Sequence, residues 1–310
     1  MTSIGNLDWK GIFVIPPTPF HDDLQVDYDG LRNVLRFALD CGAHGIVANA
    51  NASESPFLSE TERRRTVELV IKECKGKAPV VIGVSSPCAA VTVEYAKFAA
   101  GAGADGLMSM PPTQQRPGEA EIRSFYKALG AATPLPVFIQ NWGGPGGTPM
   151  AARFVAELIR DNPTCCCVKE ETEYASQVMS EILDAAGGAC KVMMGGKTGR
   201  PLFEEYRRGG RGTMPACEVP DIQVRLWDKL DGGDETGAEE LHRALLPLLI
   251  MELGYGPHFW KAVLKRRGII RGVAVRQTGG RKLDQAALDY VDHLLRQLAP
   301  LMDKRYPLPA

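Results

Sequence analysis

The sequence lacks the features that mark several large classes of protein. None of its apolar runs is long enough to span a bilayer, and no basic segment followed by an apolar core opens the 310-residue chain. Its net charge of −1 gives no electrostatic reason to expect nucleic acid or an anionic membrane as a partner. We therefore expect no signal peptide, a cytoplasmic location, and neither nucleic acid nor a membrane as a partner.

The eight cysteines lack the spacing of a disulfide framework or a metal site. Residues 165–167 are three consecutive cysteines, and the other five are scattered through apolar segments. A free cysteine behaves as a small buried hydrophobe. No CxxC pair or Cys/His cluster has zinc-site spacing. We therefore expect reduced thiols, no metal and no cofactor.

A pattern of one apolar run followed by one amphipathic segment repeats along the first two thirds of the chain. Short apolar runs alternate with segments of helical periodicity, and one of these segments opens with Ser59 and Glu62 in the relation of a capping box. Such alternation predicts parallel strands covered on both faces by helices. The eight expected strands lie in "GIFVIPPTPF", "HGIVANA", "APVVIGV", "DGLMSMPP", "LPVFIQ", "CCCVK", "CKVMMGG" and "RGTMPA".

Eight such units favour a closed (β/α)8 TIM barrel over an open doubly wound sheet, which stays the alternative. No GxGxxG motif follows the first expected strand, so dinucleotide binding has no support. Beyond Asp221 every expected element is a helix. The sequence therefore predicts a barrel over residues 1–220 and a C-terminal helical extension, packed on the barrel, over residues 221–310.

A lysine ends the sixth expected strand. The stretch "CCCVKEETE" begins at Cys165 and reaches Lys169 directly after its apolar residues. Catalytic groups of a TIM barrel lie at the C-terminal ends of its strands, so Lys169 is expected in the barrel mouth. A desolvated lysine loses part of its preference for the charged form, and a neutral amine can add to a ketone to form a Schiff base. The alternative is an unreactive Lys169 paired with a glutamate that follows it.

Polar residues and glycines follow the other strands at the same expected end. A polar rim around one lysine is therefore predicted. Its members are Thr18, the stretch from Asn49 to Ser55, "MPPTQQ" (110–115), Gln140, Gly195, Gly196, Cys217 and Glu218.

Five motifs in order along the chain resemble those of the dihydrodipicolinate synthase/N-acetylneuraminate lyase family of class I aldolases. They are "PPTPF" (16–20), "GIVANANASES" (45–55), "GADGLMSMPP" (103–112), "LPVFIQN" (135–141) and "VKEE" (168–171). The resemblance covers nearly the whole chain. It implies a (β/α)8 barrel, Lys169 as the Schiff-base residue, a small-molecule 2-keto acid as substrate, and a homo-oligomer of two or four chains.

The sequence departs from the family pattern where the family holds its substrate. The usual GTTGE, which grips the ketoacid carboxylate, is matched here by "ANASE" (50–54). The strand-five tyrosine that relays protons is matched by Gln140, and the tyrosine of the neighbouring subunit falls at or beside Thr113. The stretch "NWGGPGG" (141–147) lacks the arginine that holds the second substrate in lysine biosynthesis. We therefore do not expect a role in lysine biosynthesis.

These departures look like the branch that includes 2-keto-3-deoxy-L-arabonate dehydratase. The late region "LPLLIMELGYGPHFWKAVLKRRGII" (246–270) is also similar to that branch's helical extension. The resemblance implies a carbon–oxygen lyase that dehydrates a 2-keto-3-deoxy sugar acid. Three alternatives stay open: a pyruvate-dependent aldolase that cleaves such an acid, a catalytically lapsed ketoacid-binding barrel, and a deaminase of a cyclic imino acid.

Catalytic roles follow from this scheme. Lys169 attacks the C2 ketone, and a base then removes the acidified C3 proton. Gln140 cannot ionise, so it orients substrate or water. Glu171 and Glu218 are candidates for the base, as is a water held by the substrate, and each glutamate also has a structural interpretation.

Binding roles follow from the same resemblance. Backbone amides near Asn51 and Ala52 are expected to hold the carboxylate. Ser53 is a candidate to orient a substrate hydroxyl, and Thr18 a candidate to lie under the lysine; capping or strand-end hydrogen bonds are the alternative for these two. Gly195 and Glu218 complete the expected substrate site.

Overall fold

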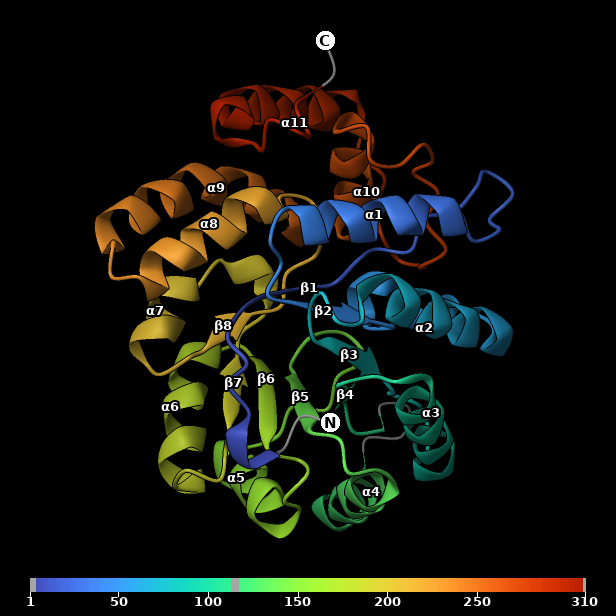
Figure 1. The fold of residues 1–310 in the computed structure, drawn as a ribbon, viewed down its shortest axis with the longest axis vertical. Helices are drawn as coiled ribbons and strands as arrows, with labels where there is room; N and C mark the ends of the chain where they lie inside the picture. The colour runs from blue at the N-terminus through green and yellow to red at the C-terminus, as the bar shows by residue number, and fades with distance from the viewer. Residues whose placement is uncertain (1–3, 113–116, 309–310) are drawn as a thin grey trace. The chain divides into compact units, whose positions relative to one another are not determined.

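A computed structural model describes residues 4–112 and 117–308. Within these residues eight parallel strands form a nearly closed (β/α)8 barrel with helices between them, followed by a C-terminal helical extension (Figure 1). The predicted fold class is thus confirmed. The strands are β1 (Gly11–Val14), β2 (Gly45–Ala48), β3 (Val80–Gly83), β4 (Gly106–Ser109), β5 (Val137–Trp142), β6 (Cys167–Glu171), β7 (Val192–Met194) and β8 (Gly212–Thr213). Their order in the sheet is β7-β6-β5-β4-β3-β2-β1-β8.

Helices connect the strands and continue after the last one. In the described part of the chain, none combines the length and apolarity needed to cross a membrane. The helices are α1 (Tyr28–Asp40), α2 (Glu60–Cys74), α3 (Ala89–Ala102), α4 (Glu119–Ala132), α5 (Ala152–Asp161), α6 (Ala175–Ala186), α7 (Leu202–Arg207), α8 (Pro220–Asp231), α9 (Glu235–Tyr255), α10 (Pro257–Arg266) and α11 (Gln285–Leu298). The short 3₁₀ turns include η2 (Asn51–Ser53) and η4 (Lys197–Gly199).

The chain divides into two compact units. The first comprises residues 1–10 and 79–214, and holds β3 to β8 with α3 to α7. The second comprises residues 11–78 and 215–310, and holds β1, β2, α1, α2 and α8 to α11. The expected division of the chain at residue 220 stays a prediction.

In the first unit β3 and β4 are buried on both faces because helices cover them outside and neighbouring side chains fill the inside. Every residue of β3 and β4 is buried, and α3 to α6 lie outside the strands in Figure 1. Trp9 stacks on Phe138 of β5 with ring centroids 6.0 Å apart. A Cβ at Gly106 would lie 2.7 Å from the Trp9 ring, so only glycine leaves room for this indole.

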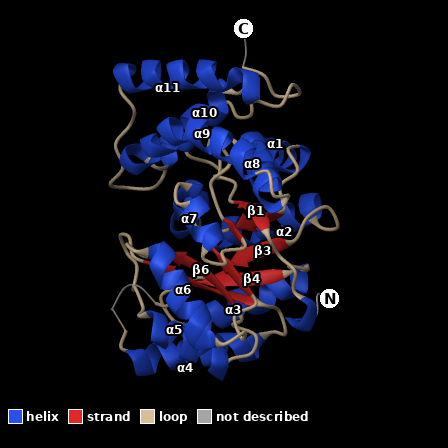
Figure 2. Cartoon of the chain, turned by 90° about the vertical axis from the view of Figure 1, so that its left-hand side faces the viewer, coloured by secondary structure: helices blue, strands red, loops and turns tan. Residues whose placement is uncertain are grey.

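The second unit contains the helical extension. Here α8 packs against β1, α9 against α8, and both α10 and α11 against α9, as Figure 2 also shows. At the start of α2, Ser59 and Glu62 form the expected capping box, with Ser59 N donating to Glu62 Oε2 at 2.8 Å. This cap satisfies backbone donors that would otherwise lack partners at the helix start.

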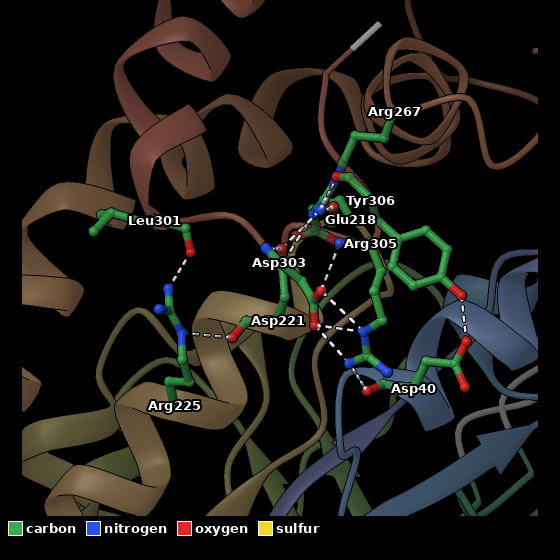
Figure 3. A network of polar contacts seen from close by, with 9 residues as sticks. All are labelled: Asp40, Glu218, Asp221, Arg225, Arg267, Leu301, Asp303, Arg305 and Tyr306. Carbon is green, nitrogen blue, oxygen red and sulfur yellow. Dashed lines mark hydrogen bonds and ion pairs between the residues drawn. The ribbon is translucent and has the colours of Figure 1, made fainter.

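A buried ion pair fastens the end of the chain within the second unit (Figure 3). Arg267 donates through Nη1 and Nη2 to the two carboxylate oxygens of Asp221, at 2.8 and 2.7 Å. Asp221 also accepts from Asp303 N at 2.8 Å, and Arg267 donates to Tyr306 O at 3.1 Å. The start of α8, the end of α10 and the C-terminal segment are therefore held by one network.

Two strands run beyond the apolar stretches that predicted them. The sequence placed their ends at Gln140 and Lys169, whereas β5 continues to Trp142 and β6 to Glu171. The added residues pair across the ladder, Asn141 with Glu170 and Trp142 with Glu171. Strand pairing continues past the apolar residues because polar side chains there have partners on the neighbouring strand. Lys169 therefore lies two residues before the end of its strand.

Candidate active site

The strand extension places a carboxylate beside the lysine. Side chains alternate between the two faces of a strand, so Lys169 and Glu171 share one face of β6. Both are buried, at 3% and 6% exposure. Lys169 Nζ lies 3.0 Å from Glu171 Oε2, and Gln140 Nε2 donates to the same oxygen at 2.8 Å. The three residues expected to be catalytic are thus brought together around one carboxylate oxygen.

The opposite face of the same two strands carries a second network. Asn141 Nδ2 donates to Glu170 Oε2 at 2.7 Å and to Met150 O at 3.0 Å, while Met150 N donates to Asn141 Oδ1 at 2.8 Å. Thr172 N donates to Glu170 Oε1 at 2.8 Å. Burial raises the pKa of Glu170, and its hydrogen bonds from Thr172 and Asn141 oppose the rise. This network fixes the strand ends that carry Gln140, Lys169 and Glu171.

Two consecutive glycines after β7 give the neighbouring carboxyl groups their space. A Cβ at Gly196 would lie 2.1 Å from Glu171 Oε1, and a Cβ at Gly195 would lie 2.0 Å from Glu205 Oε2. Any larger side chain at either position would displace a carboxyl group. The structure thus places Gly195, which the sequence assigned to substrate binding, against the side chain of Glu205 on α7.

Glu205 is a buried acid that sequence reasoning missed. It is 1% exposed, and neither carboxyl oxygen has a hydrogen-bond partner among the described residues. Burial, and then the negative charge of Glu171, raise the pKa of Glu205 to about 8. Its neighbour Glu204 is exposed and pairs with Arg208. The only sequence signal was a pair of glutamates on a short amphipathic helix, one of which must turn inward.

The loop after β7 is held over the end of β6. Lys197 Nζ donates to Thr172 O at 2.5 Å and to Glu173 O at 3.3 Å. Lys197 and Thr198 both adopt positive φ, at 48° and 57°. Beside this contact a cavity of about 430 Å³ is lined by the loop after β6 and by the starts of α6 and α7, with Lys197 and Arg200 among its side chains. Two cationic side chains and the carboxylates of Glu173 and Glu204 therefore lie on this part of the rim.

In the second unit, two expected binding residues meet each other. Thr18 Oγ1 donates to Ser53 O at 2.7 Å, and Ser53 Oγ donates to Pro16 O at 3.0 Å. Both hydroxyls therefore donate to backbone carbonyls, which are hydrogen bonds of the structural kind given above as the alternative for Thr18 and Ser53. Together the two bonds hold the loop after β1 to η2, which contains Asn51 and the buried Ala52.

Glu218, after β8, is completely buried in the second unit. Neither of its carboxyl oxygens has a hydrogen-bond partner among the described residues. Burial, and then the charge of Glu252 on α9, raise the pKa of Glu218 to about 8. Its backbone carbonyl accepts from Arg267 Nη1 at 3.3 Å (Figure 3). Burial therefore favours the protonated form of this side chain.

The expected site residues fall into two groups, one in each unit. Lys169, Glu171 and Gln140 meet in the first unit, and Thr18 meets Ser53 in the second. Thr113 lies outside the described residues. Across residues 4–112 and 117–308, no group of three His, Cys, Asp or Glu side chains is arranged to hold a metal ion. What the first group offers chemically is an amine and a proton acceptor within hydrogen-bond distance in a buried place.

Comparison with known proteins identifies the family. Residues 8–297 match the model of the dihydrodipicolinate synthetase family. The chain belongs to this family. Its members are Schiff-base, pyruvate-dependent lyases or aldolases that act on small molecules.

Individual relatives of the dihydrodipicolinate synthetase family cover most of the chain. A 4-hydroxy-tetrahydrodipicolinate synthase from Pelodictyon phaeoclathratiforme is 31% identical over 264 residues, which are 84% of this chain and 88% of the relative. The crystal structure of a dihydrodipicolinate synthase from Rhodopseudomonas palustris has a TM-score of 0.85 at 28% identity, over 93% of this chain and 97% of that one. A prophage protein of the family from E. coli K12, in complex with pyruvate, has a TM-score of 0.85 at 24% identity over 94% and 99% of the two chains, which shows the shared fold.

Proposed function

We propose that this member of the family is a Schiff-base-forming lyase that dehydrates a 2-keto-3-deoxy sugar acid. The observation that carries the proposal is the buried cluster in which Glu171 contacts both Lys169 and Gln140. It supplies a nucleophile and a proton acceptor without the tyrosine that the family normally uses. The branch likeness of "ANASE" and of Gln140 supports the dehydration in particular.

Glu171 prepares the nucleophile in the first step. Its carboxylate accepts a proton from the Lys169 ammonium at 3.0 Å, which leaves a neutral amine. The amine nitrogen adds to the C2 carbonyl, and the resulting carbinolamine loses water, taking the proton back from Glu171, to give an iminium. Gln140 holds the carboxylate oxygen through its amide, so it acts as a positioning residue for Glu171.

The second step removes the C4 hydroxyl. The iminium withdraws electrons from C3, and Glu171, ionised again, removes a C3 proton to form an enamine. The enamine electrons then expel the C4 hydroxyl, which leaves as water with the proton from Glu171. The unsaturated iminium that remains is hydrolysed, which frees the keto acid and regenerates Lys169. One carboxyl group thus serves as base and then acid, the roles assigned to the missing tyrosine.

The carboxylate end of the substrate is assigned from the family resemblance. Backbone amides near Asn51 and Ala52 hold it, as charge-assisted hydrogen bonds to a carboxylate are strong. Thr18 and Ser53 support this loop through their bonds to backbone carbonyls. Gly195 contributes to the site by leaving room for the carboxyl group of Glu205. The completely buried Glu218 stays a candidate for substrate binding.

Retro-aldol cleavage is the second candidate. The same iminium accepts electrons from a breaking C3–C4 bond, in which case the C4 hydroxyl is deprotonated and not expelled. The pyruvate found in the E. coli relative, the product that such cleavage would give, favours this alternative. A lapsed barrel that only binds keto acids is favoured by the Lys169–Glu171 ion pair itself, because pairing alone can account for a buried lysine.

The test is intact-mass analysis after borohydride reduction, with pyruvate and with 2-keto-3-deoxypentonates, of the wild type and of Lys169→Ala. We expect a reduced adduct on Lys169 in the wild type and none in the variant. An adduct with the mass of the dehydrated acid supports the dehydratase, whereas a pyruvate adduct formed from the sugar acid supports the aldolase. If none of the keto acids gives an adduct, the Schiff-base mechanism is wrong. Sedimentation velocity of the wild type tests the homo-oligomer of two or four chains that the family resemblance implies.

A further inference from the structure

The loop that contains η2 ends on a buried carboxylate. Glu54, the residue directly after η2, is 0% exposed and adopts φ 53° and ψ 32°. A left-handed conformation is unfavourable for a residue with a Cβ and persists only where surrounding contacts hold it. Burial of a carboxylate likewise requires partners. Glu54 therefore combines an unfavourable backbone conformation with an unfavourable burial of charge.

Glu54 is held by a lysine and two backbone amides from far along the second unit. Lys261 Nζ of α10 lies 2.5 Å from Glu54 Oε1 and is also 0% exposed. Arg276 N and Gln277 N both donate to Glu54 Oε2 at 2.8 Å. Every oxygen of the carboxylate thus has a charged or backbone donor, although the lysine is 207 residues away in sequence.

Lys261 has further partners that fix its amine. Its Nζ donates to Ala274 O at 2.8 Å and lies 4.3 Å from the centroid of the Phe20 ring. Burial lowers the pKa of Lys261 to about 8, and the Glu54 carboxylate opposes that change. The ammonium is therefore surrounded by a carboxylate, a carbonyl and an aromatic face.

The segment that contributes the backbone amides is itself fastened beside the loop. Arg276 donates to both carboxylate oxygens of Glu62, each at 2.7 Å, and to Phe57 O at 3.0 Å. Its guanidinium lies 4.4 Å from the centroid of the Phe20 ring. Glu54 and the residues that follow it, Phe57 and Glu62, are thus tied to the segment from Ala274 to Gln277, which we call the clamp segment.

We propose that the Glu54–Lys261 ion pair and the clamp segment position η2 so that backbone amides near Asn51 and Ala52 can bind the carboxylate of a 2-keto acid. This inference rests on the proposed function and makes Glu54 and Lys261 positioning residues. The hydroxyls of Thr18 and Ser53 hold η2 to the loop after β1, and Glu54 holds its other end to the extension. Binding amides work only when their direction is fixed before the ligand arrives.

The test compares Glu54→Gln and Lys261→Met with Asp221→Asn. Asp221 is a matched control because it too is a buried carboxylate that pairs with a cation, Arg267, and accepts a backbone N–H. Its partners are Arg267, directly after α10, and Asp303, and neither belongs to η2 or to the clamp segment. Borohydride trapping of Lys169 is followed as a function of pyruvate concentration, well below the unfolding midpoint of each variant. The half-saturating pyruvate concentration reports carboxylate binding, and the limiting rate reports the chemistry of Lys169.

We expect the half-saturating pyruvate concentration to rise about tenfold or more in Glu54→Gln and in Lys261→Met, here called the clamp variants. This change is equivalent to about 1.4 kcal/mol of binding free energy. The limiting rate should stay within about twofold of the wild type, and Asp221→Asn should change neither quantity. Equal half-saturation in the wild type and both clamp variants, or an equal rise in Asp221→Asn, would overturn the proposal. A wild type that traps no pyruvate overturns the proposed function instead, and this inference with it.

Discussion

At the scale of single residues, the proposed mechanism depends on the contact between Glu171 and Lys169. A lysine in a buried place needs a group that takes its proton before it can attack a carbonyl, and Glu171 is 3.0 Å away. The sequence placed both residues near a barrel mouth through the stretch "VKEE". It left Glu171 among several possible bases, because three carboxylates follow Lys169 within four positions. Only the face alternation of an extended β6 singles out Glu171.

Replacement of Glu171 by Gln should slow the reaction without removing the nucleophile. We expect the rate of imine formation with pyruvate to fall by roughly 10² to 10⁴-fold, the usual contribution of general acid–base catalysis. Borohydride trapping in single-turnover conditions measures it. Glu173→Gln is the control, because Glu173 is exposed and carries the same charge two positions later. Equal losses in both variants would contradict the role of Glu171.

At the scale of elements, the strands were predictable and their polar ends were not. Continuous apolar runs such as "VVIG" and "GLMS" specify buried parallel strands on their own. The last two residues of β5 and β6 depend on Asn141 and Glu170 finding each other across the ladder, which a single sequence does not reveal. The inward turn of Glu205 on α7 depends on Gly195 in the same way, because only a glycine leaves the carboxyl room.

Glu205 makes the stability of α7 and its surroundings depend on pH. Its pKa is about 8 in the folded protein and 4.5 as the ordinary value, so between these limits the folded state keeps a proton that the unfolded state has lost. The free energy of unfolding should therefore decrease as pH rises from 4.5 to 8 and lose this dependence outside that window. Glu205→Gln should flatten the decrease, while Glu218, with a pKa raised in the same direction, keeps part of it.

Urea unfolding at a series of pH values between these limits measures the effect of Glu205. Glu204→Gln is the matched control, since Glu204 is the exposed neighbour on the same helix. A Glu205→Gln protein with the slope of the wild type would show that Glu205 titrates at its ordinary pKa.

At the scale of the whole molecule, contacts between distant parts of the sequence separate what could be predicted from what could not. Local periodicity predicts the barrel and a helical extension, because each element carries its own pattern. The Glu54–Lys261 and Asp221–Arg267 pairs join segments 207 and 46 residues apart, and neither has a local signature. The sequence pattern therefore indicated Lys169, which follows an apolar strand. It gave no sign that Lys261, which lies on a helix, is also buried.

Loss of Lys261 should destabilise the fold more than loss of the whole pair. Lys261→Met leaves the Glu54 carboxylate buried without a cation, and breaking a buried pair from one side costs about 3–5 kcal/mol. The double variant Glu54→Gln/Lys261→Met should recover part of that loss, because no uncompensated charge remains. Denaturant unfolding of the wild type, both single variants and the double variant measures the coupling. Additive losses would mean that the two side chains do not act as a pair.

Under the proposed mechanism, the two buried lysines of the described part of the chain should differ in chemical labelling. Lys261 is 0% exposed and its amine donates to a carboxylate and to a carbonyl, so an aldehyde or activated ester has no access to it while both contacts are in place. Lys169 has a single carboxylate partner that can relieve it of its proton. A carbonyl probe that carries a carboxylate would therefore mark one amine of the interior and ignore the other. A fluorescent label could then be attached to Lys169 inside the barrel without any substitution in the chain.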